Sequence, residues 1–185
     1  DVLVFALYNQ QRLDERAKKS KFSYLVSNGL ITEEQLNLVK EESRASGDSF
    51  ENILMNKYNV PKTEIGQSLE YFYQSRFISF DPNTPIPGDL LKNLRKDYLQ
   101  REIWVPLEKS DKNVHVIIDD PQNIIKRDAI ENLMRTKAIK YDVALAEDII
   151  KFINYFFQAP EDETSISDIL GKLDAEDEVE GEMED

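Results

Sequence analysis

The stretch "NGLITEEQLNLV", residues 28–39, contains a turn followed by the first turns of an amphipathic helix. Thr32 is a favourable N-cap, because its hydroxyl oxygen can accept a hydrogen bond from the backbone N–H three residues later. Gln35 stands where the reciprocal partner of a capping box belongs. Leu36 and Val39 then follow at helical spacing, and Ser43, Ser46 and Gly47 mark the end of the helix. The sequence therefore predicts a helix that begins after Thr32 and ends at about Gly47.

The same pattern returns 29 residues later in the chain. A shift of that length superposes residues 20–43 on residues 49–72, and Thr32 then falls on Pro61, which is also suited to the first turn of a helix. The matched apolar pairs are Leu25 with Leu54, Val26 with Met55, Ile31 with Val60, and Leu36 with Ile65. Each unit would be a short helix, a turn and a longer helix, and two packed units would bury faces that one unit exposes. Two unrelated helical hairpins stay open as the alternative, because spacing alone does not distinguish them.

From about residue 65 onward, helix-like and strand-like segments alternate. The predicted elements are a helix over 65–73, a short strand over 77–80, a helix over 88–100, paired strands over 103–107 and 114–118, a helix over 124–134, a strand over 139–145 and a helix over 147–157. The loop at 109–113 would close a hairpin between the paired strands. From residue 88 the order is α-β-β-α-β-α, which describes a small sheet covered by helices.

These elements predict an α+β protein in four parts. Residues 1–19 would be a leading helix or linker, 20–80 a helical subdomain of two helix-turn-helix repeats, 81–158 a small α/β subdomain, and 159–185 an acidic linker or tail. The formal net charge is −13, and residues 160–185 hold twelve Asp or Glu and one Lys, which sum to −11. The rest of the chain is therefore nearly neutral and shows no basic stripe, so we expect no nucleic-acid partner.

Two features favour the cytoplasm as the location of the chain. It contains no cysteine, which excludes disulfides and thiolate chemistry and fits a reducing compartment. The longest apolar run near its start, residues 2–7, is too short to span a bilayer and lacks the basic residues of a signal peptide.

Residues 24–36, which read YLVSNGLITEEQL, are similar to a segment that reads LLVEKGLITEEQL in a known family, where it often occurs twice. Four later segments match that family in the same order: RFISF at 76–80, YLQREIWVPL at 98–107, VHVIIDDP at 114–121 and ALAEDI at 144–149. On these motifs, roughly residues 20–157 resemble the N-terminal domain of type II secretion and type IV pilus assembly ATPases, the GspE-type N-terminal domain.

This resemblance implies a non-catalytic regulatory or docking domain. It also implies a protein partner, which would be an inner-membrane platform component of the secretion or pilus machinery, or the ATPase core itself. The implied location is the cytoplasm or the inner face of the inner membrane, peripheral to the membrane at most.

In some members of the family the doubled motif binds cyclic di-GMP, through an Arg-Leu-Gly start in each copy and the apolar residues that follow. By this resemblance the candidate contacts are Lys21, Phe22, Leu25, Val26, Gly29, Phe50 and Leu54. The chain departs from the pattern at the two motif starts, residues 20–22 and 49–51, where Phe22 and Glu51 replace the glycines. The charge of Glu51 would repel a phosphate. A one-residue gap would place Ser23 at the first glycine position instead.

No catalytic or metal site is predicted. The pair Gly171-Lys172 lacks the upstream glycine and the following Ser or Thr of a phosphate-binding loop. His115 is the single histidine, and the chain has no Cys or second His to complete a transition-metal site with it. The segment Asp119-Asp120-Pro121 is expected to end a strand and open a helix rather than to bind a metal.

Three functions stay open on the sequence alone. The first is the non-catalytic regulatory or docking domain that the resemblance implies. The second is a cyclic di-GMP sensor that uses the repeat at 20–72, and the third is a protein-interaction module whose acidic tail binds or shields a basic surface. Apart from cyclic di-GMP in the second, none of them calls for a cofactor.

Overall fold

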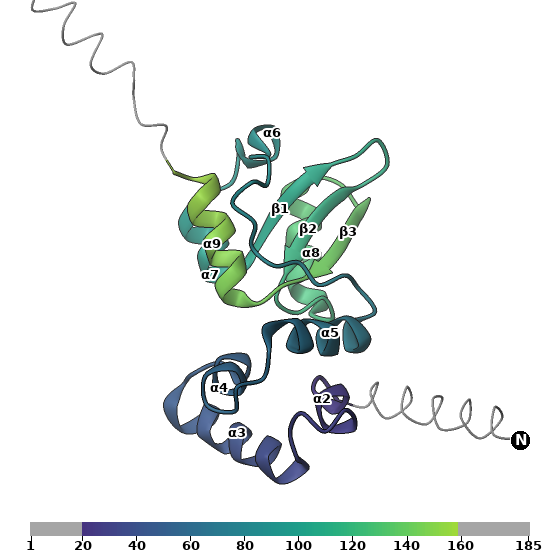
Figure 1. Ribbon diagram of the computed structural model, residues 1–185. Helices are drawn as coiled ribbons and strands as arrows, with labels where there is room; N and C mark the ends of the chain where they lie inside the picture. The colour runs from purple at the N-terminus through teal and green to yellow at the C-terminus, as the bar shows by residue number, and fades with distance from the viewer. Residues whose placement is uncertain (1–19, 159–185) are drawn as a thin grey trace, which may run out of the picture.

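The computed structural model describes residues 20–158, so the predicted leading segment at 1–19 and the acidic tail at 159–185 lie outside the described residues. Helices and a three-stranded sheet make up this part of the chain, as the α+β prediction requires (Figure 1). The elements are α2 (Ser23–Ser27), α3 (Glu33–Ser46), α4 (Phe50–Asn56), α5 (Lys62–Tyr73), α6 (Gly88–Leu91), α7 (Lys96–Glu102), β1 (Trp104–Lys109), β2 (Val114–Ile118), α8 (Ile124–Met134), β3 (Ile139–Val143) and α9 (Ala146–Phe156).

The capping signals of α3 act as the sequence predicts. The Thr32 hydroxyl oxygen accepts a hydrogen bond from the Gln35 backbone N–H at 3.1 Å, and the Thr32 N–H donates to Gln35 Oε1 at 2.9 Å. The helix ends at Gly47, whose φ of 78° lies in the left-handed region that glycine adopts without strain. Local chemistry alone therefore fixes both ends of this helix.

The two repeat units are built alike, and each has a short helix, a turn and a longer helix. Thr32 and Pro61 occupy the N-cap positions of α3 and α5, 29 residues apart. The carbonyl oxygens of the matched residues Leu25 and Leu54 close the two turns, accepting bonds from the N–H groups of Leu30 at 2.9 Å and Val60 at 3.0 Å. Both leucine side chains are fully buried.

The packing of the repeat is exchanged between the units. The short helix of the first unit, α2, packs against the long helix of the second, α5, while α3 of the first unit packs against α4 of the second. Each unit therefore covers the apolar face of the other, which explains why one unit alone would lack a core.

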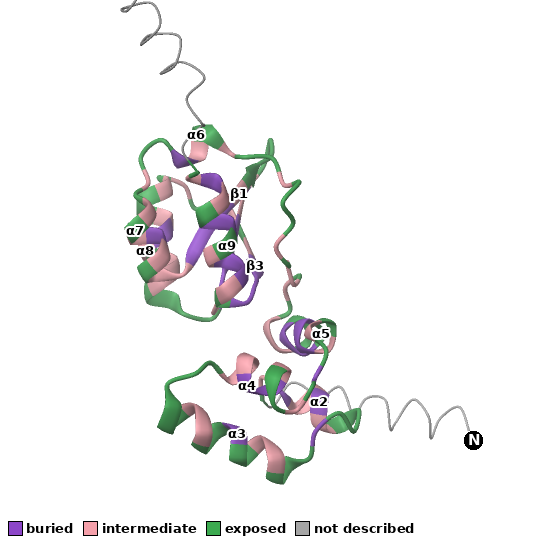
Figure 2. Ribbon diagram, turned by 60° about the vertical axis from the view of Figure 1, so that its left-hand side comes forward, coloured by how far each residue is buried: buried purple, intermediate pink, exposed green. Residues whose placement is uncertain are grey.

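The sheet has the strand order β1-β2-β3. Strands β1 and β2 form the predicted antiparallel hairpin, with Trp104 opposite Ile118, and β2 and β3 are parallel, with α8 in the connection between them. Helix α9 packs against β1 and β2, and α7 packs against α9 and β1. Figure 2 shows buried positions concentrated on the strands and on α9, where Trp104 and Phe152 are the largest fully buried side chains.

Two predicted elements differ in the structure. The helix expected over 88–100 is two helices, α6 and α7, separated by residues 92–95. Leu91 of α6 and Leu99 of α7 are both buried in the core of the sheet. The strand expected over 77–80 is a single bridge between Phe77 and Val143, because the chain meets β3 only at its last residue.

The helical repeat and the sheet share part of their cores. The apolar cluster of the helical repeat includes Val143 and Leu145, which belong to the end of β3 and the turn before α9. Backbone hydrogen bonds join the same point to the connecting segment, from Ile78 N–H to the Val143 carbonyl and from Val143 N–H to the Arg76 carbonyl, both at 2.9 Å. The two parts are thus held against each other where β3 ends.

Candidate functional site

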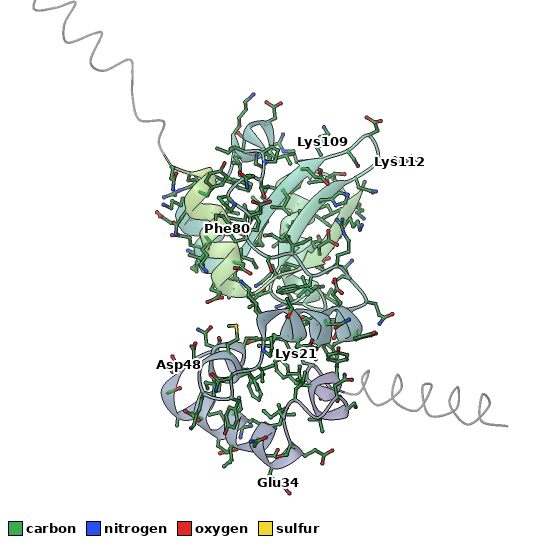
Figure 3. All side chains as sticks on the ribbon, in the orientation of Figure 1. Lys21, Glu34, Asp48, Phe80, Lys109 and Lys112 are labelled. Carbon is green, nitrogen blue, oxygen red and sulfur yellow. The ribbon has the colours of Figure 1, made fainter. Side chains whose placement is uncertain are left out.

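A cavity of about 460 Å³ lies where the helical repeat meets the carboxyl ends of β2 and β3. Its lining residues are Lys21, Ser49, Glu51, Asn52, Leu69, Tyr73, Asp119, Asp120, Ala144, Leu145, Ala146 and Glu147. Figure 3 shows Lys21 at this junction, between the helices of the repeat and the sheet. The cavity is therefore built by segments that are far apart in the sequence.

The starts of both repeat units reach this cavity. Lys21 belongs to the first unit, and Glu51 occupies the position 30 residues later, at the start of the second. Ser68 of α5, which is 1% exposed, donates a hydrogen bond from its hydroxyl to the Lys21 carbonyl oxygen at 2.7 Å and so fixes the backbone there. The motif starts that the family resemblance singles out thus face one common space.

The charges around the cavity are mostly negative. Lys21 Nζ lies 2.6 Å from Glu51 Oε1, and Lys126 Nζ lies 2.7 Å from Asp119 Oδ1, so each of these cations already has a carboxylate partner. Asp120 and Glu147 add two further carboxylates to the lining. A ligand phosphate would therefore meet more negative than positive charge.

Tyr73 places a phenol on the same lining. Burial raises its pKa above the ordinary value of 10.0, and the neighbouring charge of Asp120 raises the pKa further. The phenol therefore stays protonated at neutral pH. A protonated hydroxyl can donate a hydrogen bond, so Tyr73 adds a neutral donor beside the carboxylates of the lining.

Six of the seven candidate contacts lie in the cavity lining or in the core of the repeat. Lys21 lines the cavity. Phe22 is buried and stacks on Phe50, with ring centroids 5.0 Å apart and an interplanar angle of 8°. Leu25 and Leu54 are fully buried in the helical core, and Val26 packs against that core.

Gly29, the last of these candidates, is exposed and lies in the turn before α3 with a φ of 69°. No atom lies within 4 Å of the position that a Cβ would occupy there. Its backbone conformation accounts for the glycine without any ligand.

Several lining residues were not candidates on the sequence. The sequence predicts Asp119 and Asp120 at the junction of a strand and a helix, and Tyr73 and Glu147 within helices. The Asp119-Asp120-Pro121 segment does follow the end of β2, and Asp120 Oδ1 accepts a hydrogen bond from the Gln122 N–H at 3.0 Å. It does not open the helix as predicted, because the N-cap of α8 is Asn123. The carboxyl ends of β2 and β3 meet because the strands are parallel, and this pairing is not visible from local sequence.

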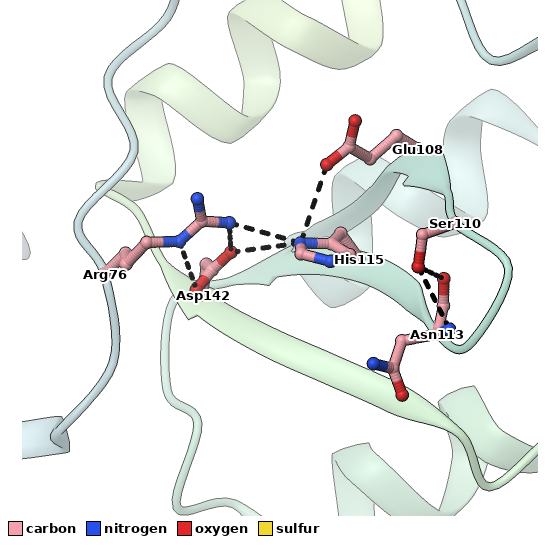
Figure 4. A network of polar contacts seen from close by, with 6 residues as sticks. All are labelled: Arg76, Glu108, Ser110, Asn113, His115 and Asp142. Atoms are coloured by element: carbon pink, nitrogen blue, oxygen red, sulfur yellow. Dashed lines mark hydrogen bonds and ion pairs between the residues drawn. The ribbon is translucent and has the colours of Figure 1, made fainter.

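A second polar cluster surrounds His115 on the sheet (Figure 4). The Asp142 carboxylate is buried, and it accepts hydrogen bonds from Arg76 Nε at 3.3 Å and Arg76 Nη2 at 2.6 Å. His115 Nδ1 lies 3.2 Å from the same Arg76 nitrogen and 3.7 Å from Glu108 Oε1. The cluster ties the segment after α5 to β2 and β3.

A third contact of this kind joins α5 directly to α9. Lys62 Nζ lies 2.7 Å from Oδ1 and 2.6 Å from Oδ2 of Asp148, a carboxylate with no solvent exposure, and 3.7 Å from Glu147 Oε1.

Within residues 20–158, no group of three or more His, Asp or Glu side chains is arranged to hold a metal ion. In the same range, no helix is long and apolar enough to cross a membrane.

Comparison with known proteins assigns part of the chain to a family. Residues 73–163 match the model of the MshEN domain, so the match begins at the end of α5. Comparison with curated proteins gives no match.

Two solved structures share the fold. A structure of MshE with cdg is similar at a TM-score of 0.59 and 15% sequence identity, over 75% of this chain and 99% of that one. A structure of the N-terminal domain of XpsE is similar at a TM-score of 0.53 and 15% identity, over 77% of this chain and 96% of that one. At this identity the likeness concerns the fold. The family model of the MshEN domain thus matches residues 73–163, and the chain shares the fold of these two solved structures.

Proposed function

We propose that this chain is a non-catalytic regulatory and docking domain of a secretion or pilus-assembly ATPase. The MshEN match over residues 73–163 is the observation that carries the proposal. The partner would be the cytoplasmic part of an inner-membrane platform protein, or the ATPase core, with the domain in the cytoplasm at the inner face of the membrane. Its action would be to hold that partner in a fixed position.

The contacts between the helical repeat and the sheet support a positioning role. Two buried carboxylates, Asp142 and Asp148, each pair with a cation from outside the sheet, Arg76 and Lys62. The shared apolar core at Val143 and Leu145 adds to these ion pairs. A domain joined in this way presents its surfaces at fixed relative positions, as docking of a larger assembly requires.

The start of α8 offers the surface on which docking is best tested. Ile124 and Ile125 are 70% and 84% exposed, the highest values among the exposed large apolar side chains of residues 20–158, and both lie within the MshEN match. We expect Ile125→Asp to weaken binding of the platform protein's cytoplasmic part by about tenfold, measured by titration calorimetry, because a charge would enter an apolar contact.

The matched control is Leu38→Asp on α3, which is 60% exposed and lies outside the MshEN match. This variant should bind as the original chain does. Failure of the original chain to bind either the platform part or the ATPase core would overturn the docking proposal. If both variants weaken partner binding equally, the start of α8 is not the docking surface.

Cyclic di-GMP binding is the second candidate function. The cavity favours it, because the starts of both repeat units face one space of about 460 Å³, and the solved MshE structure of the same fold contains cdg. The carboxylates of Asp119 and Asp120 could accept hydrogen bonds from the N–H donors of guanine. Against it stand the acidic lining, the Lys21–Glu51 ion pair and the Phe22–Phe50 stack at the motif starts.

Titration calorimetry with cyclic di-GMP separates the two candidates. We expect no saturable heat of binding at about 100 µM ligand. Any binding would then be weaker than a free energy of about 5 kcal/mol. Binding that is micromolar or tighter, lost in Lys21→Glu and kept in Lys40→Glu, would instead establish a sensor. Lys40 is a suitable control because it is exposed on α3, away from the cavity lining.

A further inference from the structure

The hairpin end of the sheet carries a second pocket, of about 320 Å³, with an apolar base and a basic rim. Leu90 of α6, Val114 of β2 and Met134 of α8 contribute apolar surface to it. Residues 109–113 of the hairpin and the end of α8 form the rest of its wall. The pocket lies at the opposite end of the sheet from the cavity described above, and Figure 3 shows Lys109 and Lys112 there.

Three cations line this pocket against one carboxylate. They are Lys109, Lys112 and Arg135, and the carboxylate belongs to Asp111. Within residues 20–158, none of these three cations lies within 4.0 Å of a carboxylate oxygen, although many other Lys and Arg side chains of that range do. Unpaired cations beside apolar surface favour an occupant that is anionic and carries apolar side chains.

The acidic tail of the same chain has this composition. Residues 160–185 contain twelve Asp or Glu and one Lys, and Ile166, Ile169 and Leu170 stand among them at the i, i+3, i+4 spacing of one helical face. Asp168 lies within that apolar group. The tail therefore offers carboxylates to the cations of the pocket and apolar side chains to its apolar surface.

The end of α9, from which the tail continues, lies near this pocket. Figures 1 and 2 both show the end of α9 beside α6, at the same end of the sheet as the hairpin. Leu90 of α6 is itself part of the pocket. The seven residues from 159 to 165 can span about 23 Å when extended, which suffices to carry Ile166 past a helix of one turn.

We propose that residues 165–173 of the acidic tail dock in this pocket within the same chain, with Ile166, Ile169 and Leu170 on its apolar base and the neighbouring carboxylates beside Lys109, Lys112 and Arg135. Because the tail is covalently attached, its effective concentration is on the order of millimolar, so weak contacts suffice. An anionic partner of this pocket must then displace the tail. The proposal does not depend on the docking or cyclic di-GMP functions.

Paramagnetic relaxation enhancement tests the contact in the full chain. The sequence has no cysteine, so Ser167→Cys gives one site for a nitroxide label. At low salt we expect the amide signals of residues 109–114 and of Arg135 to lose more than half their intensity relative to the reduced label. At about 0.5 M NaCl, where the Debye length falls to about 4 Å, most of that intensity should return.

Two variants that change the net charge equally distinguish a specific contact at the hairpin from a general electrostatic attraction between the tail and the domain. Lys112→Glu on the hairpin should restore more than half of the lost intensity, while Lys40→Glu on α3 should leave the loss unchanged. Both lysines are exposed. Unshifted amide signals in the rest of the domain confirm that each variant keeps its fold.

Three results would overturn the proposal. The first is an absence of intensity loss at the hairpin at low salt. The second is an equal response of the two variants. The third concerns a mixture of two copies, one with the nitroxide and no isotope label, the other with the isotope label and no nitroxide. An intensity loss in that mixture would show that the contact forms between copies.

Discussion

Replacing Lys62 with alanine is expected to lower the free energy of unfolding by about 3 kcal/mol. Asp148 has no solvent exposure, and Lys62 Nζ lies within 2.7 Å of both of its carboxylate oxygens. Without Lys62, the nearest cation is Lys151, at 4.0 Å. A buried carboxylate would then keep little compensation for its lost hydration. We place the loss at the lower end of the range for broken buried pairs because Lys62 itself is 32% exposed.

Equilibrium unfolding in urea measures this effect, and the fluorescence of Trp104, the fully buried single tryptophan, reports it. Lys57→Ala is the matched control, since Lys57 pairs with Glu42 at 2.5 Å where both side chains reach solvent. That variant should lose much less stability, because an exposed ion pair contributes little. Similar losses of stability in both variants would contradict a stabilising role for the buried Lys62–Asp148 ion pair between α5 and α9.

A paired replacement separates the charge effect from the loss of packing. The double variant Lys62→Met, Asp148→Leu removes both charges together and keeps similar side-chain volume. Its stability should exceed that of Lys62→Ala by about 2 kcal/mol, because apolar replacements of buried ion pairs are often neutral. A double variant as unstable as the single one would show that the contact matters for its shape rather than for its charge.

The substitution Gly66→Ala is expected to destabilise the protein by about 2 kcal/mol, although alanine is the better helix former by about 1 kcal/mol. Gly66 is buried within α5, and a Cβ there would stand 2.3 Å from Phe77 Cδ1 and 2.6 Å from Phe77 Cε1. The ring has little freedom to move aside, because the Phe77 N–H donates to Glu70 Oε1 at 2.7 Å and its backbone bridges to Val143.

Urea unfolding of four chains forms a double-mutant cycle for this contact. In a Phe77→Ala background, Gly66→Ala should become neutral or stabilising, because the clash is gone and the helix preference remains. Gly88→Ala provides a control, since nothing lies within 4 Å of a Cβ at that position. A gain of stability from Gly66→Ala in the original background would refute the close packing of α5 on the connecting segment.

The sequence predicted the helix boundaries best where the signals are local. Thr32, Gln35 and Gly47 act on backbone groups within a few residues, so the limits of α3 followed from them without tertiary information. The spacing of Thr32 and Pro61 suggested two similar units but left unrelated hairpins open, and the structure places both residues at N-caps. The hairpin of β1 and β2 was predicted for the same reason, since its loop and its strands are adjacent in the chain.

The predictions failed where packing decides between local alternatives. Residues 88–100 have the composition of one helix, but the chain forms two helices, α6 and α7, and Leu91 and Leu99 are both buried in the core of the sheet. Residues 77–80 have the composition of a strand, yet within residues 20–158 their pairing with the sheet is a single bridge to the last residue of β3. Neither the core geometry nor the length of β3 is encoded within these segments.

The sequence by itself thus determined the fold class, the limits of α3 and the hairpin of β1 and β2, because capping and periodicity act over a few residues. Only the tertiary structure decided the exchanged packing of the units and the place of the candidate site. Lys21, Glu51, Tyr73, Asp120 and Glu147 come from separate segments, and the pairing of β2 with β3 and the docking of α5 bring them to one cavity. Contacts between residues so distant in the chain depend on the complete packed core, which no single stretch of sequence specifies.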